Sequence, residues 1–138
     1  MARSFWLRTI GVPHPPQYLR EFSHLCSWSP KGFYGLIAGF CEIGETFEEN
    51  VQREAMEEVG IKVKNVTYYK NQPWGISDSH MIGFFAELDG DDETLVLQEE
   101  EIADARWFTP EEVRRPANNF SLFSDLVWKF LQDHGIKK

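Results

Sequence analysis

Apolar side chains recur at every fourth residue along one stretch in the middle of the chain: Phe47, Val51, Ala55 and Val59. This spacing places them on one stripe of a helix, which is the pattern of a helix that packs against a core. Thr46 and Glu49 have the T-x-x-E spacing of a capping box, and Gly60 follows the last apolar position, where a left-handed residue ends many helices. We therefore expect an amphipathic helix bounded by Thr46 and Gly60.

Other hydrophobic runs predict strands, at 33–38, 61–69, 81–88, 94–97 and 105–108. Thr109 and Pro110 have the pattern of a helix start, so a short helix is expected there, and residues 121–133 read as a closing amphipathic helix. Residues 4–10 are compatible with a strand, but three prolines follow within six residues.

Three carboxylates lie beside the apolar stripe of the central helix. Glu54, Glu57 and Glu58 stand at i, i+3 and i+4, so their like charges are neighbours and disfavour the helix by roughly 0.2–0.5 kcal/mol per pair. The plainest interpretation is an acidic, solvated helix face. The alternative is a site for a hard cation such as Mg²⁺, which oxygen ligands of this kind hold. Only Arg53 offers a positive partner within the helix, and the spacing alone leaves both interpretations open.

Composition narrows the class of protein. A chain of 138 residues with 42% hydrophobic content is expected to form one domain with a sizeable core. Its formal net charge of −8 argues against nonspecific binding to nucleic acid or to an anionic membrane, because both need basic surface. Cys26 and Cys41 are too few for a zinc ribbon or a disulfide framework. The N-terminus has no continuous apolar run, and no run in the chain is long enough to span a membrane, so we expect a cytoplasmic protein with reduced thiols.

The whole stretch 39–61 matches the pattern G-x5-E-x7-R-E-U-x-E-E-x-G-U, in which U is a bulky aliphatic or small apolar residue. The matching positions are Gly39, Glu45, Arg53, Glu54, Ala55, Glu57, Glu58, Gly60 and Ile61. This is the Nudix box, and the chain resembles a Nudix hydrolase. The resemblance implies one α/β domain over 1–138, an α/β/α sandwich with a mixed sheet. The segment 1–32 departs from the family, so either it is divergent or one strand of the sheet is missing.

The resemblance also implies a metal cage that binds a pyrophosphate. Mg²⁺ or Mn²⁺ would be held by the main-chain carbonyl of Ala38 and by the carboxylates of Glu54, Glu57 and Glu58. Arg53 would hold the neighbouring carboxylates in order. Glu57 is either a metal ligand or the base that acts on the attacking water, and because the base differs among Nudix enzymes it is left unassigned.

A second stretch, 71–79, reads NQPWGISDS and resembles the S-Q-P-W-P-F-P-x-S motif of the NADH pyrophosphatase branch of the family. The matching residues, which the resemblance assigns to substrate binding, are Gln72, Pro73, Trp74 and Ser79. Trp74 offers a flat face for stacking a base, and Gln72 and Ser79 offer hydrogen bonds. The Pro-Phe-Pro centre is absent, which removes a second aromatic wall. The alternative for Trp74 is a core aromatic at a strand end.

Two further residues enter through the same branch. One more metal-binding glutamate is expected upstream of the Trp107-Phe108 pair, which places it at Glu101 with a register uncertain by one, since three glutamates stand in a row there. Phe123, at the start of the last helix, either approaches the substrate base or packs in the core, which is the usual role of such a residue.

The function implied is metal-dependent hydrolysis of the pyrophosphate bond of a nucleoside diphosphate derivative, with NADH or NAD⁺ as first choice and AMP and nicotinamide mononucleotide as products. The same cage would serve ADP-ribose, a nucleoside triphosphate or an NAD-capped RNA. A second class of function is a catalytically inactive module that binds a nucleotide, against which the intact carboxylate set argues. The expected partner is a small-molecule nucleotide and no membrane. Many family members are homodimers, which the resemblance allows here.

Overall fold

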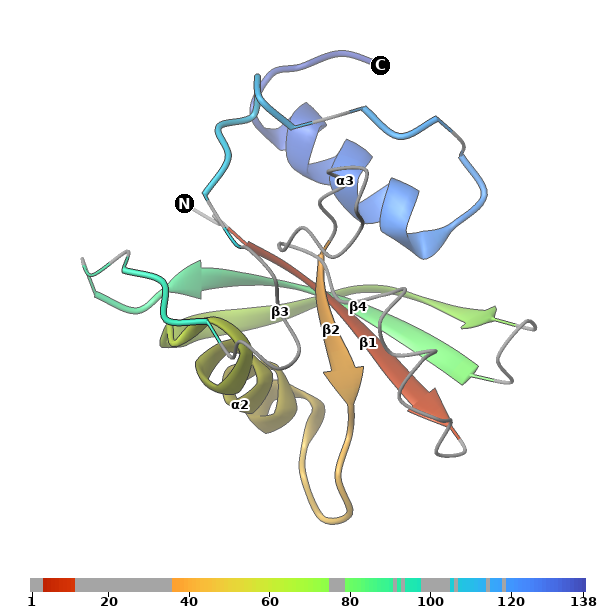
Figure 1. The fold of residues 1–138 in the computed structure, drawn as a ribbon. Coiled ribbons are helices and arrows are strands. Elements are labelled where there is room, and N and C mark those ends of the chain that lie inside the picture. The colour runs from red at the N-terminus through yellow and green to blue at the C-terminus, as the bar shows by residue number, and fades with distance from the viewer. Residues whose placement is uncertain are drawn as a thin grey trace.

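The computed structural model of the chain is shown in Figure 1. It describes residues 4–11, 36–74, 79–90, 92, 94–97, 105, 107–113, 115–117 and 119–138. The elements follow one another as β1 (Ser4–Gly11), β2 (Ile37–Phe40), α2 (Phe47–Val59), β3 (Val63–Trp74), β4 (Ser79–Leu88) and α3 (Leu122–Asp133).

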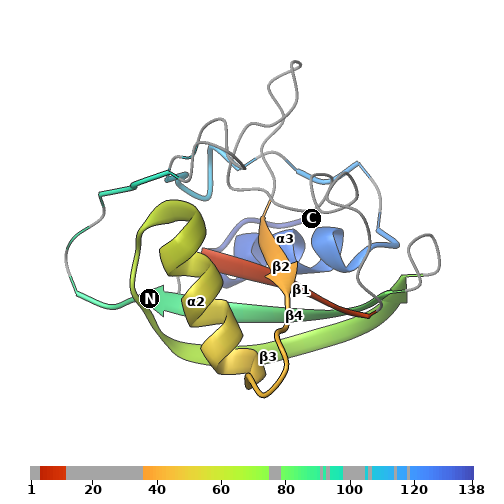
Figure 2. The ribbon, with the colours of Figure 1, turned by 60° about the horizontal axis from the view of Figure 1, so that its bottom comes forward.

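The four strands form one sheet in the order β2-β1-β4-β3. β1 is parallel to β2 and antiparallel to β4, and β3 and β4 are antiparallel neighbours. The sheet is therefore mixed. The helices α2 and α3 lie on opposite sides of it, as Figure 1 and the turned view in Figure 2 show. This arrangement confirms the predicted α/β class with a helix on each face.

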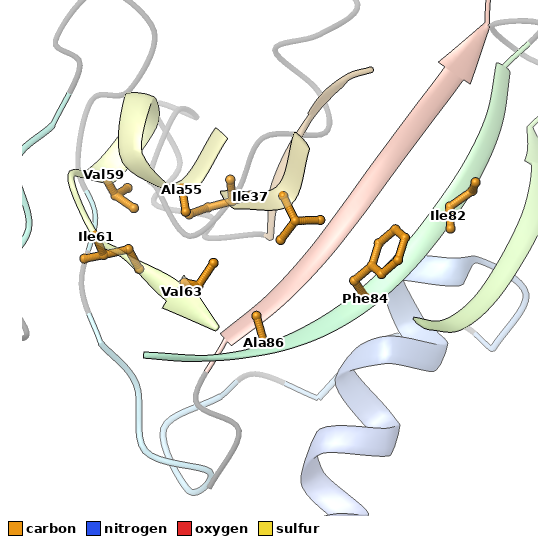
Figure 3. Close-up of a cluster of buried hydrophobic side chains, with 9 residues drawn as sticks. Ile37, Ala55, Val59, Ile61, Val63, Ile82, Phe84 and Ala86 are labelled. Atoms are coloured by element: carbon orange, nitrogen blue, oxygen red, sulfur yellow. The ribbon is translucent and has the colours of Figure 1, made fainter. Parts of the chain in front are cut away.

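Each face of the sheet has its own hydrophobic cluster. Alternate residues of β4 supply both, because successive side chains of a strand point to opposite faces. Ile82 and Phe84 join Ala55 and Val59 of α2 (Figure 3). Met81 instead lies in the cluster that holds the buried stripe of α3: Leu122, Leu126, Val127, Phe130 and Leu131.

The central helix has the bounds that its sequence predicts. Thr46 accepts a hydrogen bond from the backbone N–H of Glu49, and the Glu49 carboxylate accepts one from the backbone N–H of Thr46, which completes the capping box. Such a cap contributes about 1 kcal/mol. Gly60 ends the helix in the left-handed conformation, with φ of 69°.

The strand that the sequence left in question is present. β1 lies inside the sheet, where it pairs with β2 on one side and with β4 on the other. Its formation depends on these distant partners rather than on a local pattern, which is why the prolines after it obscured it. Within the segment 1–32, only the residues of β1 are described.

Other sequence-based elements need correction. β2 continues through Gly39 and Phe40, beyond the predicted end at residue 38. β3 extends to Trp74 because its residues from Lys70 to Trp74 pair continuously with β4, so the motif 71–79 reaches from β3 into β4. The described residues of 94–97 and 105–108 form no strand; several of them pack as loop residues against the core, and Val96 makes one backbone bond, to Val59. The predicted helix after Thr109 is a single turn in the described residues.

Candidate functional site

Arg53 of α2 joins the loop that follows β2 to the helix. Its Nε donates to Oε1 of Glu45 at 2.6 Å, and its Nη2 donates to Oε2 of the same carboxylate at 3.2 Å. Nη2 also donates to the carbonyl oxygen of Phe40, the last residue of β2, at 3.1 Å. The hydrogen bonding of Arg53 to the Glu45 carboxylate, together with the hydrogen bonds from the Glu42 backbone and Asn50, lowers the pKa of Glu45 from 4.5 to about 2. Glu45 is therefore an anion that fixes the loop.

Asn50 reinforces this connection from inside the protein. Its side chain is fully buried, and Nδ2 donates to the Phe40 carbonyl at 2.8 Å and to Oε2 of Glu45 at 2.5 Å. The sequence analysis did not single out this residue. The available signal was an asparagine next to Val51, on the buried stripe of an amphipathic helix, where an amide needs a hydrogen-bonding partner.

Glu54 packs directly against the backbone of β2. A Cβ built on Gly39 would lie 2.3 Å from the Glu54 carboxyl carbon, so only glycine leaves room for this carboxylate. Oε1 of Glu54 also lies 3.2 Å from Nη2 of Arg53, and the side chain is only 12% exposed. The first glycine of the box is thus explained by a close approach between a strand and a side chain of the helix.

The other two carboxylates differ in their surroundings. Glu57 is 53% exposed at its side chain and forms an ion pair with Nη1 of Arg53 at 2.9 Å. Glu58, one turn after Glu54, is only 4% exposed. Burying an ionised carboxylate is costly unless charges or hydrogen bonds compensate it. In addition to Glu54, the helix thus has one carboxylate that faces solvent, Glu57, and one that is buried, Glu58.

This donor set suits a hard divalent cation. Among the described residues, no three His, Cys, Asp or Glu side chains are gathered tightly enough to hold a metal ion by themselves. Mg²⁺, however, keeps several waters and commonly takes one or two protein carboxylates together with substrate phosphates. Glu54 and Glu58 would supply such carboxylates, with Glu54 held against the backbone that follows Ala38. Glu101 lies outside the described residues.

The second predicted site lies on the β3–β4 hairpin. Trp74 and Ser79 are paired across the two strands, and Pro73 is paired with His80; the side chains of Trp74 and Ser79 lie outside the described part of the chain. Gln72, predicted to bind substrate, uses its amide on the protein instead. Nε2 donates to the carbonyl of Phe120 and Oε1 accepts from the backbone N–H of Leu122, both at 2.8 Å.

Phe123 packs in the core, which is one of the two roles expected for it from the sequence. Its side chain is partly buried and packs against the cluster beneath α3. The hydrogen bonds of Gln72 show that the start of α3 and the end of β3 are in direct contact.

The sheet register connects the two sites. Thr9 of β1 is the partner of Phe40 on one side and of Met81 on the other, and Met81 is the partner of Gln72. One row across the sheet therefore runs from the end of β2 to the hairpin motif. Three interstrand spacings separate its ends, about 14 Å.

Comparison with known proteins agrees with this geometry. The profile of the NUDIX domain family matches residues 19–126. The chain belongs to the Nudix domain family. This confirms the family inferred from the box and the fold class that it implied.

Curated relatives of this Nudix chain include proteins named NAD-capped RNA hydrolase NudC. The one from Mannheimia succiniciproducens is 47% identical over 89 residues, which cover 64% of this chain and 33% of the relative. The one from Haemophilus influenzae (strain Rd) is 48% identical over 88 residues, 63% of this chain and 33% of the relative. The one from Mycobacterium bovis is 47% identical over 85 residues, 62% and 27%. The chain spans about a third of the length of the relatives it matches.

Two smaller points bear on the surroundings of the site. None of the described helices is long and apolar enough to cross a membrane. Cys41, in the loop between β2 and α2, carries a reduced thiol, and its Sγ donates to the carbonyl of Glu45 at 3.4 Å.

Proposed function

We propose that this Nudix chain hydrolyses the pyrophosphate bond of a nucleoside diphosphate derivative in a divalent-metal-dependent reaction, with NADH or NAD⁺ as substrate and AMP and nicotinamide mononucleotide as products. The observation that carries the proposal is the carboxylate set around Arg53. One guanidinium contacts Glu45, Glu54 and Glu57, while Gly39 admits the Glu54 carboxylate against the end of β2. An acidic helix face that was merely solvated would not need this arrangement.

When bound, Mg²⁺ or Mn²⁺ would neutralise the negative charge of the phosphates. It would also lower the pKa of a water, so that the water can attack phosphorus as hydroxide. Glu54 and Glu58 are the residues proposed to hold it, with Glu57, the Ala38 carbonyl and Glu101 as further candidates. Hydrolysis consumes one water, forms one P–O bond and breaks one P–O bond of the anhydride. The chain's own contribution is orientation: Arg53 holds Glu54 on one side and the loop carboxylate Glu45 on the other.

The hairpin motif supports an NAD-like substrate. Pro73, Trp74 and Ser79 remain proposed to contact the substrate, and Gln72 is proposed to serve the same site through its hydrogen bonds to the start of α3. In the sheet register, this hairpin lies on the same row as the end of β2. A substrate with a ring system joined through a pyrophosphate would extend from one to the other.

An NAD-capped RNA is a second candidate substrate. The specific observation in its favour is the name of the relatives that match this chain. The same cage would cleave the same anhydride. The net charge of −8 disfavours nonspecific contacts to an RNA chain, so a cap would be recognised through its nucleotide. The proposal includes a cytoplasmic location and a homodimer as the assembled state.

Product analysis tests the proposal. The chain is incubated with NADH, NAD⁺, ADP-ribose, a deoxynucleoside triphosphate panel and an NAD-capped oligoribonucleotide, each with Mg²⁺, Mn²⁺ or a chelator. AMP and reduced nicotinamide mononucleotide from NADH, formed only with metal, are expected. Cleavage of another substrate alone would retain the cage and reject the assignment of the hairpin motif. No turnover by folded protein would favour a binding module.

A further inference from the structure

The amide of Gln72 acts as a clamp between β3 and the start of α3. Its nitrogen donates to the carbonyl of Phe120 and its oxygen accepts from the N–H of Leu122, each at 2.8 Å. These two backbone groups flank Ser121, the N-cap of α3. One side chain therefore fixes both the entry of the chain into α3 and the position of the residue just before the cap.

The clamp works within a close contact between α3 and the sheet. Nζ of Lys70, two residues before Gln72 on β3, lies 2.5 Å from Oδ2 of Asp125 on α3. On the neighbouring strand β4, a Cβ at Gly83 would lie 3.0 Å from a methyl group of Leu126. The start of α3 thus has a defined position relative to the end of β3.

The backbone of Phe120 is held in place by this clamp. Its side chain is 70% exposed although it is a large apolar ring, and its carbonyl is held by Gln72, two residues before Trp74. Residues 75–78, which follow Trp74 in the motif, include no aromatic residue. Among the described residues, two exposed aromatic residues are hydrogen-bonded to the motif: Tyr68, whose hydroxyl accepts from Asn71, and Phe120, whose carbonyl accepts from Gln72. The Tyr68 ring already packs edge-on against Phe84, so Phe120 is the candidate for a further aromatic surface at this end of the sheet.

We propose that Phe120 is a binding residue that stacks on a planar ring of the nucleotide substrate, and that Gln72 is a positioning residue that holds Phe120 there. The inference rests on the proposed function for the identity of the ligand, a nucleotide whose phosphate lies toward the end of β2. An aromatic side chain stacks on a base without hydrogen-bond readout, so the contribution depends on a flat face.

The test measures binding rather than turnover, by calorimetry with three probes: nicotinamide mononucleotide, AMP and ribose 5-phosphate, which has no ring base. Phe120→Ala is expected to weaken binding of at least one ring-bearing probe about tenfold, the lower range of a lost stacking contact, and to leave ribose 5-phosphate unchanged. Phe120→Tyr, which keeps the flat face, is expected to bind like the wild type.

Gln72→Met is expected to reproduce the effect of Phe120→Ala, because it removes both hydrogen bonds and retains a side chain of similar length. Lys70→Met is the matched control: it breaks another contact between β3 and α3, the ion pair with Asp125, without touching Phe120. If loosening α3 alone were responsible, Lys70→Met would lose the ring-bearing probes as well, which would overturn the positioning role.

The inference is overturned if Phe120→Ala binds every probe as the wild type does, if ribose 5-phosphate is lost equally, or if the wild type shows no ring-dependent binding. These outcomes are separate from the test of the proposed function. NADH hydrolysis with an unchanged KM in Phe120→Ala would reject this inference and retain the function. If Phe120→Ala removes ring-dependent binding but no variant hydrolyses NADH, this inference is retained and the proposed function is rejected.

Discussion

Nε of Arg53 lies 2.6 Å from Oε1 of Glu45, and this ion pair connects the loop after β2 to the middle of α2. The same guanidinium contacts the Phe40 carbonyl, Glu54 and Glu57. Because the contacts converge on one side chain, the geometry of the carboxylates depends on Arg53 more than on the helix alone.

The first prediction concerns acid stability. The pKa of Glu45 is lowered from 4.5 to about 2 by Arg53, so its contribution is fully present above pH 4.5 and is lost as the pH falls toward 2. At 1.36 kcal/mol per pKa unit, the contribution is at most about 3 kcal/mol. Glu45→Gln should therefore lower the free energy of unfolding at pH 7, with a difference from the wild type that disappears near pH 2.

Urea unfolding at several pH values measures this difference. Glu48→Gln, which alters an exposed glutamate near the start of α2, is the control and should follow the wild-type curve. A Glu45→Gln variant whose deficit is the same at pH 7 and pH 2 would show that the ion pair is not its source.

Arg53→Lys is predicted to impair catalysis more than folding. Lysine retains the charge but lacks the planar fork that contacts several oxygens at once. A shift of about 1 Å in a catalytic group can reduce the rate about 100-fold. We expect a loss of that order in kcat for pyrophosphate hydrolysis, with a far-ultraviolet circular dichroism spectrum like that of the wild type. Unimpaired turnover would mean that the contacts of Arg53 do not order the site.

Gly39→Ala should separate the site from the fold. The added methyl group would lie 2.3 Å from the Glu54 carboxyl carbon, and the flexible end of a side chain can move away at little cost in stability. Metal affinity and turnover should therefore fall at least tenfold while Tm changes little. Gly44→Ala is the opposite case, because its φ is +83° and a Cβ there meets nothing: it should cost about 1–2 kcal/mol in stability. Matching effects of the two variants on metal affinity would contradict the role of Gly39.

The sequence was sufficient for α2 because every signal there is local: the capping box, the four-residue apolar stripe and the glycine stop all lie within fifteen residues. It was insufficient for β1, whose hydrogen-bonding partners lie in β2 and β4. It was also insufficient for Gln72, whose partners are 48 and 50 residues away. A motif match predicts that such a residue matters, whereas only its contacts distinguish binding from positioning.

Gly60→Ala should be among the most destabilising single changes in the box. Two causes act together: the left-handed φ of 69°, and a Cβ that would lie 2.8 Å from Cβ of Val96. We expect a loss of about 2–4 kcal/mol, from backbone strain and overpacking. Val96→Gly in the same chain removes the Cβ contact but leaves the backbone oxygen and nitrogen of Val96 at 3.2 and 3.3 Å, so it should recover only part of the loss. Full recovery would show that φ contributes nothing, and no recovery would show that the Val96 side chain does not matter.

The measurement that tests the central claim most directly is the rate of NADH hydrolysis as Mn²⁺ or Mg²⁺ is titrated into the wild type, Glu54→Gln, Glu58→Gln and the control Glu48→Gln. We predict AMP and reduced nicotinamide mononucleotide from the wild type and Glu48→Gln, with saturation by metal. Glu54→Gln and Glu58→Gln should lose at least 100-fold in rate while remaining folded. Equal rates in all four proteins, or hydrolysis that persists in a chelator, would contradict a metal-dependent site built on this helix.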